Sequence, residues 1–351
     1  AAMFGWSQHL GHLTSGGTMA NLEALWIASK LRPGKTVLAS EQAHYTHERI
    51  CGVLGIPFQK VSCDRQARLD VGALRQRLEQ GDVGTVVVTL GTTGLGSLDP
   101  LDEVLELRTQ FDFRIHVDTA YGGYFKLASN LTPRGLQTYS LLHQVDSLVV
   151  DPHKHGLQPY GCGCVLFADP SVGAFYKHDS PYTYFSSEEL HLGEISLECS
   201  RAGASAVALW ATQRLLPLIP GGAFAQRLEA SRGAALDLYQ RLHSSPDWTP
   251  VMEPELDIVV WYPQGQSASE ISQRSRQIFR QAGLRQLHLA VTQIPRSLIG
   301  ASLHWDQEHV ACLRSCLMRP EHAQQMDQLW ALLEQSRTQE MDRLPEKGTP
   351  L

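Results

Sequence analysis

Residues 146–167 of this 351-residue chain read DSLVVDPHKHGLQPYGCGCVLF, two short apolar runs on either side of a polar turn. The runs SLVV and CVLF have the length and composition of strands that are buried on both faces of a sheet. Lys154 follows closely on the first run. A charged side chain at the end of a buried strand is costly unless it is paired or chemically used. The stretch therefore predicts a buried sheet and directs attention to Lys154.

Similar runs lie upstream of this stretch and alternate with amphipathic helical patterns. The strand-like runs are KTVLAS (35–40), GTVVVTL (84–90) and RIHVD (114–118), and the helical patterns include VGALRQRLEQG (71–81) and LDEVLELRTQF (101–111). Short buried runs separated by amphipathic helices are typical of crossover units in a parallel sheet. We therefore expect an α/β domain with a mainly parallel sheet flanked by helices.

The order of elements changes after Ala204. Helical patterns are expected at 205–218, 222–245, 267–283 and 321–337, and strand-like runs at 257–263, 297–305 and 312–320. This order predicts a smaller α+β domain in the C-terminal part of the chain. We expect a large domain over residues 1–220, a small one over 221–337, and a flexible tail over 338–351.

Composition excludes several classes of function. The net charge is −6, the pI is about 6.2, and no block of like charges offers a surface for nucleic acid or an anionic membrane. No apolar run reaches the roughly 18 residues of a membrane helix, and the N-terminus lacks the pattern of a signal peptide. The seven cysteines form no zinc-binding pattern. We expect a cytoplasmic protein without a metal site.

Three features together point to one cofactor. The turn LTSGG before the helical TMANLEALW offers backbone N–H groups to a phosphate, although a plain N-cap at Ser15 or Thr18 also accounts for it. Asp118 ends a strand, where an acid can bind a ligand or cap a turn. Lys154 can act as an amine nucleophile or reach solvent. A lysine, an aspartate on a neighbouring strand and a phosphate-binding helix start are the parts that pyridoxal phosphate requires.

Seven segments carry a resemblance to a known family. They are LTSGGTMAN (13–21), SEQAHYTHE (40–48), TLGTTGLGSLDPL (89–101), IHVDTAYGG (115–123), DSLVVDPHKHG (146–156), ECSRAGASAVALW (198–210) and CLRSCLMRP (312–320). In this order they resemble the group II pyridoxal phosphate-dependent decarboxylases of aromatic amino acids, glutamate and tyrosine. The resemblance implies a type I PLP-dependent transferase-like fold. It also implies carboxy-lyase activity, in which an L-amino acid yields an amine and carbon dioxide through a Schiff base with Lys154.

The resemblance also implies roles for individual residues. Asp118 would pair with the pyridine nitrogen, and His44 and Ala120 would lie on the two faces of the ring. The remaining cofactor contacts would come from Gly16, Gly17, Thr18, Thr93 and His153. Asp151 stands where some relatives have asparagine, and because a second anion should not touch a phosphate dianion, it is not among the expected contacts.

Further residues are expected to act on the substrate. Tyr182 and Tyr184 lie where relatives carry a loop that closes over the site, and either is a candidate acid for protonating Cα. Packing of both tyrosines at a dimer interface is an equal alternative. Arg201 matches a family arginine that can meet a substrate carboxylate, and a structural ion pair explains it as well. The family builds its sites at the interface of a homodimer, so we expect a homodimer here.

Two other functions stay open on the sequence. SRAGASAVALWA also resembles sphingosine phosphate lyase, a pyridoxal phosphate-dependent carbon–carbon lyase. A catalytically silent homologue is the other alternative, because the sequence begins almost at the phosphate turn, whereas family members carry a helical segment before it. The substrate can be an aromatic amino acid, an acidic amino acid or cysteine sulfinate.

Overall fold

The computed structural model describes residues 1–177, 196–198, 201–300 and 303–341 of the chain. The chain separates into two compact units, Ala1–Leu228 and Glu229–Leu351. Within the described part, no helix has both the length and the apolar character needed to cross a membrane.

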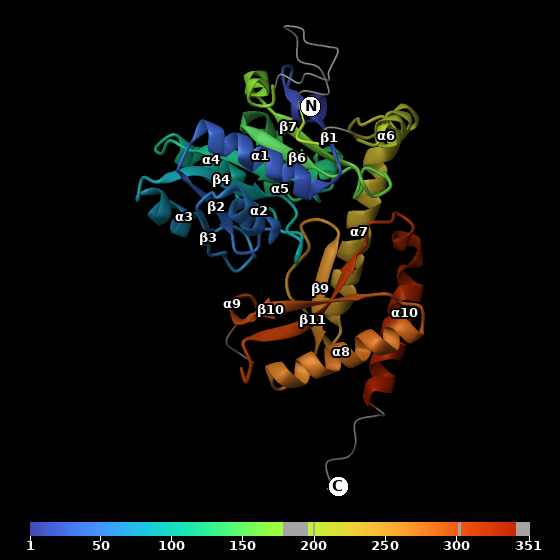
Figure 1. The fold of residues 1–351 in the computed structure, drawn as a ribbon. Coiled ribbons are helices and arrows are strands. Elements are labelled where there is room, and N and C mark those ends of the chain that lie inside the picture. The colour runs from blue at the N-terminus through green and yellow to red at the C-terminus, as the bar shows by residue number, and fades with distance from the viewer. Residues whose placement is uncertain (178–195, 199–200, 301–302, 342–351) are drawn as a thin grey trace. The chain divides into compact units, whose positions relative to one another are not determined.

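The larger unit is built on a seven-stranded sheet in the order β1-β7-β6-β5-β4-β2-β3 (Figure 1). The strands are β1 (Leu10–Thr14), β2 (Thr36–Ser40), β3 (Phe58–Val61), β4 (Val83–Thr89), β5 (Arg114–Asp118), β6 (Ser147–Val150) and β7 (Gly163–Phe167). β7 pairs antiparallel with both of its neighbours, and the other pairings are parallel. The predicted mainly parallel α/β sheet is confirmed, and every residue of β2, β4 and β6 is buried.

Among the described residues, five helices of the larger unit lie between these strands along the chain, and α6 follows β7. They are α1 (Gly17–Leu31), α2 (Thr46–Leu54), α3 (Val71–Leu78), α4 (Leu101–Arg108), α5 (Pro133–Ser140) and α6 (Gly203–Leu215), with short 3-10 turns η1 (Ala2–Phe4), η2 (Gly123–Leu127), η3 (Leu141–Gln144) and η4 (Pro170–Phe175). Local chemistry sets some of their starts: the Asp70 carboxylate accepts from the Ala73 N–H to cap α3. α1 packs its small apolar residues Ala20 and Ala24 into one buried cluster with Val149 of β6 and Val165 of β7. Figure 1 shows α1 beside these strands. This packing holds the start of α1 beside the end of β6.

The smaller unit contains a four-stranded antiparallel sheet in the order β10-β11-β9-β8. Its strands are β8 (Trp248–Pro250), β9 (Ile258–Pro263), β10 (Ala290–Pro295) and β11 (His309–Cys316), and its helices are α8 (Ala268–Leu284), α9 (Arg296–Ile299) and α10 (His322–Met341). The long helix α7 (Ala223–Ser244) begins in the larger unit and continues into this one. Trp261, Ile278 and Leu313 belong to the buried core of this unit.

One predicted strand was wrong. Residues 297–305 were expected to form a strand, but the strand beside β11 is β10, which ends at Pro295. Arg296–Ile299 form the short helix α9, and Gly300 follows it with φ of +96°. Most of β10 is only partly buried, so its sequence lacks the continuous apolar run that identifies a buried strand.

Candidate active site

The residues predicted to bind a cofactor line one cavity of about 300 Å³ in the larger unit. Its walls come from the segments that follow β1, β2, β4, β5 and β6, so it lies at the carboxyl ends of the parallel strands, the usual place for ligands in such sheets. The cavity is lined by Ser15, Gly16, Gly17, Thr18, Met19, Asn21, His44, Thr46, Thr89, Gly91, Thr93, Asp118, Ala120, Tyr121, Asp151, His153 and Lys154. All nine predicted cofactor residues are in this set. Their individual roles stay predictions.

The start of α1 forms one end of the cavity. Gly16 precedes the helix and Gly17 is its first residue, so backbone N–H groups without helical partners face the cavity. A Cβ atom on Gly163 of β7 would lie 2.5 Å from the Gly16 carbonyl carbon. A Cβ on Gly17 would lie 2.6 Å from Asp151 Oδ2. Because Gly163 and Gly17 have no side chains, the turn can lie directly against β7 and against the segment after β6.

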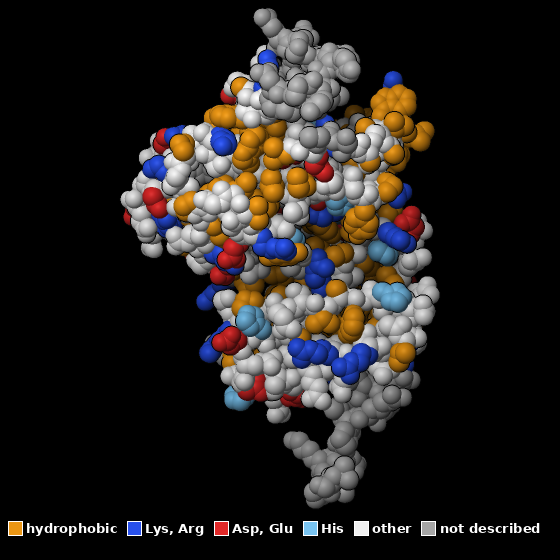
Figure 2. Space-filling view, viewed as in Figure 1, with side chains coloured by type: hydrophobic (Ala, Val, Ile, Leu, Met, Phe, Trp, Pro, Cys, Tyr) orange, Lys and Arg blue, Asp and Glu red, His pale blue; other side chains and the backbone are white. Residues whose placement is uncertain are grey.

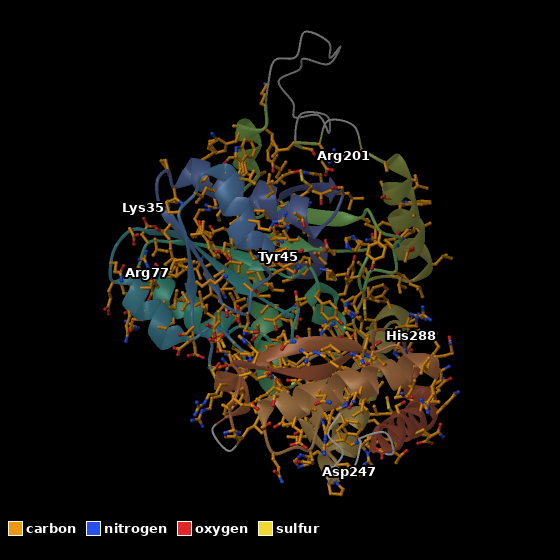
Figure 3. The ribbon with its side chains drawn as sticks, turned by 60° about the horizontal axis from the view of Figure 1, so that its bottom comes forward. Lys35, Tyr45, Arg77, Arg201, Asp247 and His288 are labelled. Atoms are coloured by element: carbon orange, nitrogen blue, oxygen red, sulfur yellow. The ribbon has the colours of Figure 1, made fainter. Side chains whose placement is uncertain are left out.

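His44 is held by its neighbour at the start of α2. The Thr46 N–H lies 3.3 Å from His44 Nδ1, and Thr46 Oγ1 lies 2.7 Å from the same nitrogen. Nδ1 therefore accepts the backbone hydrogen bond, which leaves the proton on Nε2. Burial lowers the pKa of His44 below its ordinary value, so the ring is neutral. Tyr45, labelled in Figure 3, packs beside the His44 ring with ring centroids 4.4 Å apart.

Asp118, at the end of β5, receives hydrogen bonds from three directions. His47 Nε2 lies 2.9 Å from Oδ2, Asn21 Nδ2 donates to the same oxygen at 3.3 Å, and the Ala120 N–H donates to Oδ1 at 3.0 Å. Burial by itself would raise the pKa of Asp118. The hydrogen bond and charge of His47, together with the charge of Lys154, lower it below its usual range. Asp118 is therefore a buried carboxylate that remains ionised.

The sequence argument missed His47 and Asn21. Both stand inside segments that were quoted for the family resemblance, but neither lies within 70 residues of Asp118 along the chain. Periodicity offered no signal for them. A search for buried polar residues on α1 and α2 that face the strand ends would have found both.

Lys154 pairs with a residue that was not expected in the site. Its Nζ lies 3.0 Å from Asp151 Oδ2, and His153 Nε2 lies 3.5 Å from the same oxygen. Burial raises the pKa of Asp151, although the charge of Lys154 opposes the rise. Asp151 Oδ1 and His153 Nδ1 are buried without a hydrogen-bond partner among the described residues. The segment thus keeps polar atoms available to a ligand in the cavity.

The three predicted substrate residues have different outcomes. Arg201, labelled in Figure 3, is not among the lining residues, and its Nη1 donates to the carbonyl of Leu13 in β1 at 2.8 Å. Tyr182 and Tyr184 lie outside the described residues. Their predicted roles stay predictions.

Comparison with known proteins identifies the family. Residues 15–261 match the family described as the pyridoxal-dependent decarboxylase conserved domain. The chain belongs to this family. A probable L-tyrosine/L-aspartate decarboxylase from Methanothermobacter thermautotrophicus is 30% identical over 76% of this chain and 72% of its own length. An aromatic-L-amino-acid decarboxylase from Bacillus atrophaeus is 29% identical over 72% of this chain, which spans about half, 54%, of that relative.

Solved structures of decarboxylases share the fold. Mouse CSAD matches 95% of this chain and 73% of its own with a TM-score of 0.81 and 20% identity. Oryza sativa TDC, solved with PLP and tryptamine, matches 95% of this chain and 71% of its own with a TM-score of 0.79 and 17% identity. The type I PLP-dependent transferase-like fold is thereby confirmed.

The cofactor of this decarboxylase is pyridoxal phosphate, and its reaction class is amino acid decarboxylation. The cavity fits the cofactor. The helix start, where glycines make room for a close turn, suits the phosphate, and the ionised Asp118 suits a protonated pyridine nitrogen. Lys154 lines the same cavity beside His153. The matches favour decarboxylation over the carbon–carbon lyase and over a silent homologue.

Proposed function

We propose that this enzyme decarboxylates an aromatic or acidic L-amino acid. Lys154 would hold the cofactor and would be displaced from it by the substrate amine. The observation that carries the proposal is the convergence of the start of α1, Asp118 and Lys154 on one cavity. The substrate class follows the names of the two relatives, which act on tyrosine, aspartate or aromatic amino acids.

When bound, pyridoxal phosphate supplies a protonated ring that accepts the electron pair left at Cα as carbon dioxide departs. Asp118 keeps the proton on the ring nitrogen, since an ionised carboxylate beside that nitrogen stabilises the cationic form. The neutral His44 ring, held by Thr46, would stack on one face of the cofactor ring, as the family resemblance implies, and would orient the substrate from that face. The start of α1 anchors the phosphate through Gly16, Gly17 and Thr18.

Lys154 and Asp151, in the cavity wall formed by the segment after β6, would exchange a proton. The amine of Lys154 must be neutral to act as a nucleophile, and Asp151 Oδ2, at 3.0 Å, is placed to take its proton. Burial of Asp151 favours its neutral form, because the ionised carboxylate loses hydration inside the protein. Burial therefore favours transfer of a proton to Asp151. We assign the return of a proton to Cα to Tyr182 or Tyr184, and contact with a substrate carboxylate to Arg201.

We further propose a cytoplasmic homodimer that associates through α6. None of the residues of this helix is buried, and its apolar side chains include Val207, Trp210 and Leu215, which are 66%, 60% and 82% exposed. Figure 2 shows hydrophobic side chains gathered over this helix. An apolar helix surface of this kind is typical of protein interfaces. A second copy of the chain is the partner that the family resemblance implies.

The direct test supplies the purified protein with pyridoxal phosphate and a panel of L-amino acids, and measures released carbon dioxide and the amine product. Tyrosine, aspartate, tryptophan, glutamate and cysteine sulfinate separate the substrate classes. We expect release with tyrosine or aspartate and no release from Lys154→Ala. Turnover by the Lys154→Ala protein equal to that of the unchanged enzyme would contradict the proposal.

A further inference from the structure

His47 is a buried residue that contacts Asp118 in the cavity wall. It occupies the first turn of α2, where its N–H lies 3.2 Å from the carbonyl oxygen of His44, and its side chain is fully buried. Its Nε2 lies 2.9 Å from Asp118 Oδ2. His47 does not line the cavity, so any effect on the reaction has to pass through Asp118 or through the turn that carries His44.

The direction of this hydrogen bond follows from its acceptor. An ionised carboxylate can only accept, so the proton between the two residues belongs to His47 Nε2. Nδ1 of His47 is buried and has no hydrogen-bond partner in the described part of the chain. Among the described residues, the bond to Asp118 is therefore the one hydrogen bond that sets the orientation of this ring, and it joins α2 to the end of β5.

A second set of contacts reaches Asp118 from α1. Asn21 donates to Oδ2 of Asp118, and its Oδ1 lies 2.8 Å from His116 Nε2. His116 Nδ1 in turn lies 2.8 Å from Ser147 Oγ. Burial lowers the pKa of His116 to about 3, so this ring is neutral and supplies orientation without charge. Of the two side chains that donate to Asp118, His47 alone can carry a positive charge.

We propose that His47 is a positioning residue that holds the Asp118 carboxylate in the orientation and charge state that the ring nitrogen of the cofactor requires. The inference rests on the proposed function of Asp118 and extends it to a residue that does not touch the cofactor. Because His44 and His47 stand one turn apart, the same bond also ties the stacking histidine to the end of β5. Loss of the His47 donor should leave Oδ2 of Asp118 with the Asn21 amide at 3.3 Å and Oδ1 with the Ala120 N–H at 3.0 Å.

The test compares His47→Leu, which removes the donor, with His47→Gln, which supplies a neutral amide donor. His12→Gln is a matched control, because His12 is also buried and pairs with a carboxylate, Glu23, at 2.7 Å. Each protein is loaded with pyridoxal phosphate carrying ¹⁵N in its ring. The chemical shift of that nitrogen reports its protonation directly, and kcat, KM and the thermal midpoint are measured on the same samples.

We expect His47→Leu to move the ¹⁵N resonance toward the unprotonated value and to lower kcat about 10-fold or more, with KM changed far less. His47→Gln should recover much of both effects. His12→Gln should lower the thermal midpoint and leave the resonance and kcat unchanged. An unchanged resonance in folded, cofactor-loaded His47→Leu overturns the inference while leaving the proposed function intact. Failure of the unchanged protein to bind the cofactor overturns the proposed function itself.

A measurement on the unchanged protein covers the case in which His47→Leu does not fold. With ¹⁵N-labelled histidine, the His47 signals are assigned by their absence in His47→Gln. We expect a proton on Nε2 and a shift of this resonance when pyridoxal phosphate is added. An Nε2 without a proton, or one that does not respond to the cofactor, contradicts the proposed role.

Discussion

Lys154 Nζ lies 3.0 Å from Asp151 Oδ2, in the segment that follows β6. Asp151 was left out of the expected contacts because a carboxylate and a phosphate should repel each other. The structure places it in the cavity and gives it a cationic partner instead. Burial also raises the pKa of Asp151, although the charge of Lys154 opposes the rise, and a raised pKa lessens the repulsion between this carboxyl group and an anion nearby.

Replacement of Asp151 should change how stability depends on pH. A carboxyl group whose folded pKa is raised binds its proton more tightly when folded, so stability falls as pH increases from about 3.8, the ordinary value, to the raised pKa. Asp151→Asn removes this group. We expect the cofactor-free unchanged protein to lose stability relative to Asp151→Asn as pH rises through that window. Urea titrations of both proteins between pH 4 and pH 8 measure the difference, and parallel profiles would contradict the raised pKa.

Lys154→Ala should abolish covalent attachment of the cofactor and lower turnover by orders of magnitude, because the amine is both the attachment point and the leaving group. Lys60→Ala is the control, since Lys60 pairs with Glu48 on the surface. Borohydride reduction followed by peptide mass spectrometry locates the attachment. Attachment of the cofactor to another lysine in the unchanged protein would refute the assignment.

Asp118→Asn should fold and bind the cofactor but decarboxylate slowly. The amide keeps the shape and loses the charge that stabilises a protonated ring, so the loss should fall on kcat, by about 100-fold or more. If Asp118 only caps a turn, the result is the reverse: a lower thermal midpoint and nearly normal kcat. Both quantities are measured on one sample, so the two explanations are separated directly.

Gly163→Ala should weaken cofactor binding. The new methyl group would lie 2.5 Å from the Gly16 carbonyl carbon and would push the phosphate turn away from β7. Overpacking of this kind costs about 1–3 kcal/mol, so we expect Kd for pyridoxal phosphate to rise about 10-fold or more. Gly233→Ala in α7 is the control, because its added methyl meets nothing within 4 Å. Fluorescence titration with the cofactor gives both values, and equal affinities would show that the turn adjusts freely.

Local patterns explain why several parts of the site were predictable. Lys154 and Asp118 each stand at or near the end of a β-branched run, and the glycine turn directly precedes an apolar helix. In a parallel sheet such strand ends lie at one edge, so their side chains converge without further information. Lys154, Asp118 and the glycine turn accordingly line one cavity, and the residues that only the family resemblance implied, His44, Thr93, Ala120 and His153, line it too.

Long-range contacts account for what was missed. His47 and Asp118 are 71 residues apart, and they meet because the sheet order places β2, β4 and β5 side by side, which brings the start of α2 to the end of β5. The strand β10 was misplaced for a related reason. β10 is mostly half-buried and is paired on one side in the described sheet. Its residues therefore show little of the continuous apolar pattern that identifies a buried strand.

The sequence by itself determined the alternation of buried strands and helices and the position of Lys154 at the end of a strand, because hydrophobic periodicity and turn chemistry act over a few residues. Only the tertiary structure decided which polar groups pair inside the site: His47 and Asn21 with Asp118, and Asp151 with Lys154. A buried charge is tolerated only where folding supplies a partner, and that partner comes from whichever element the packing brings near, at any distance along the chain.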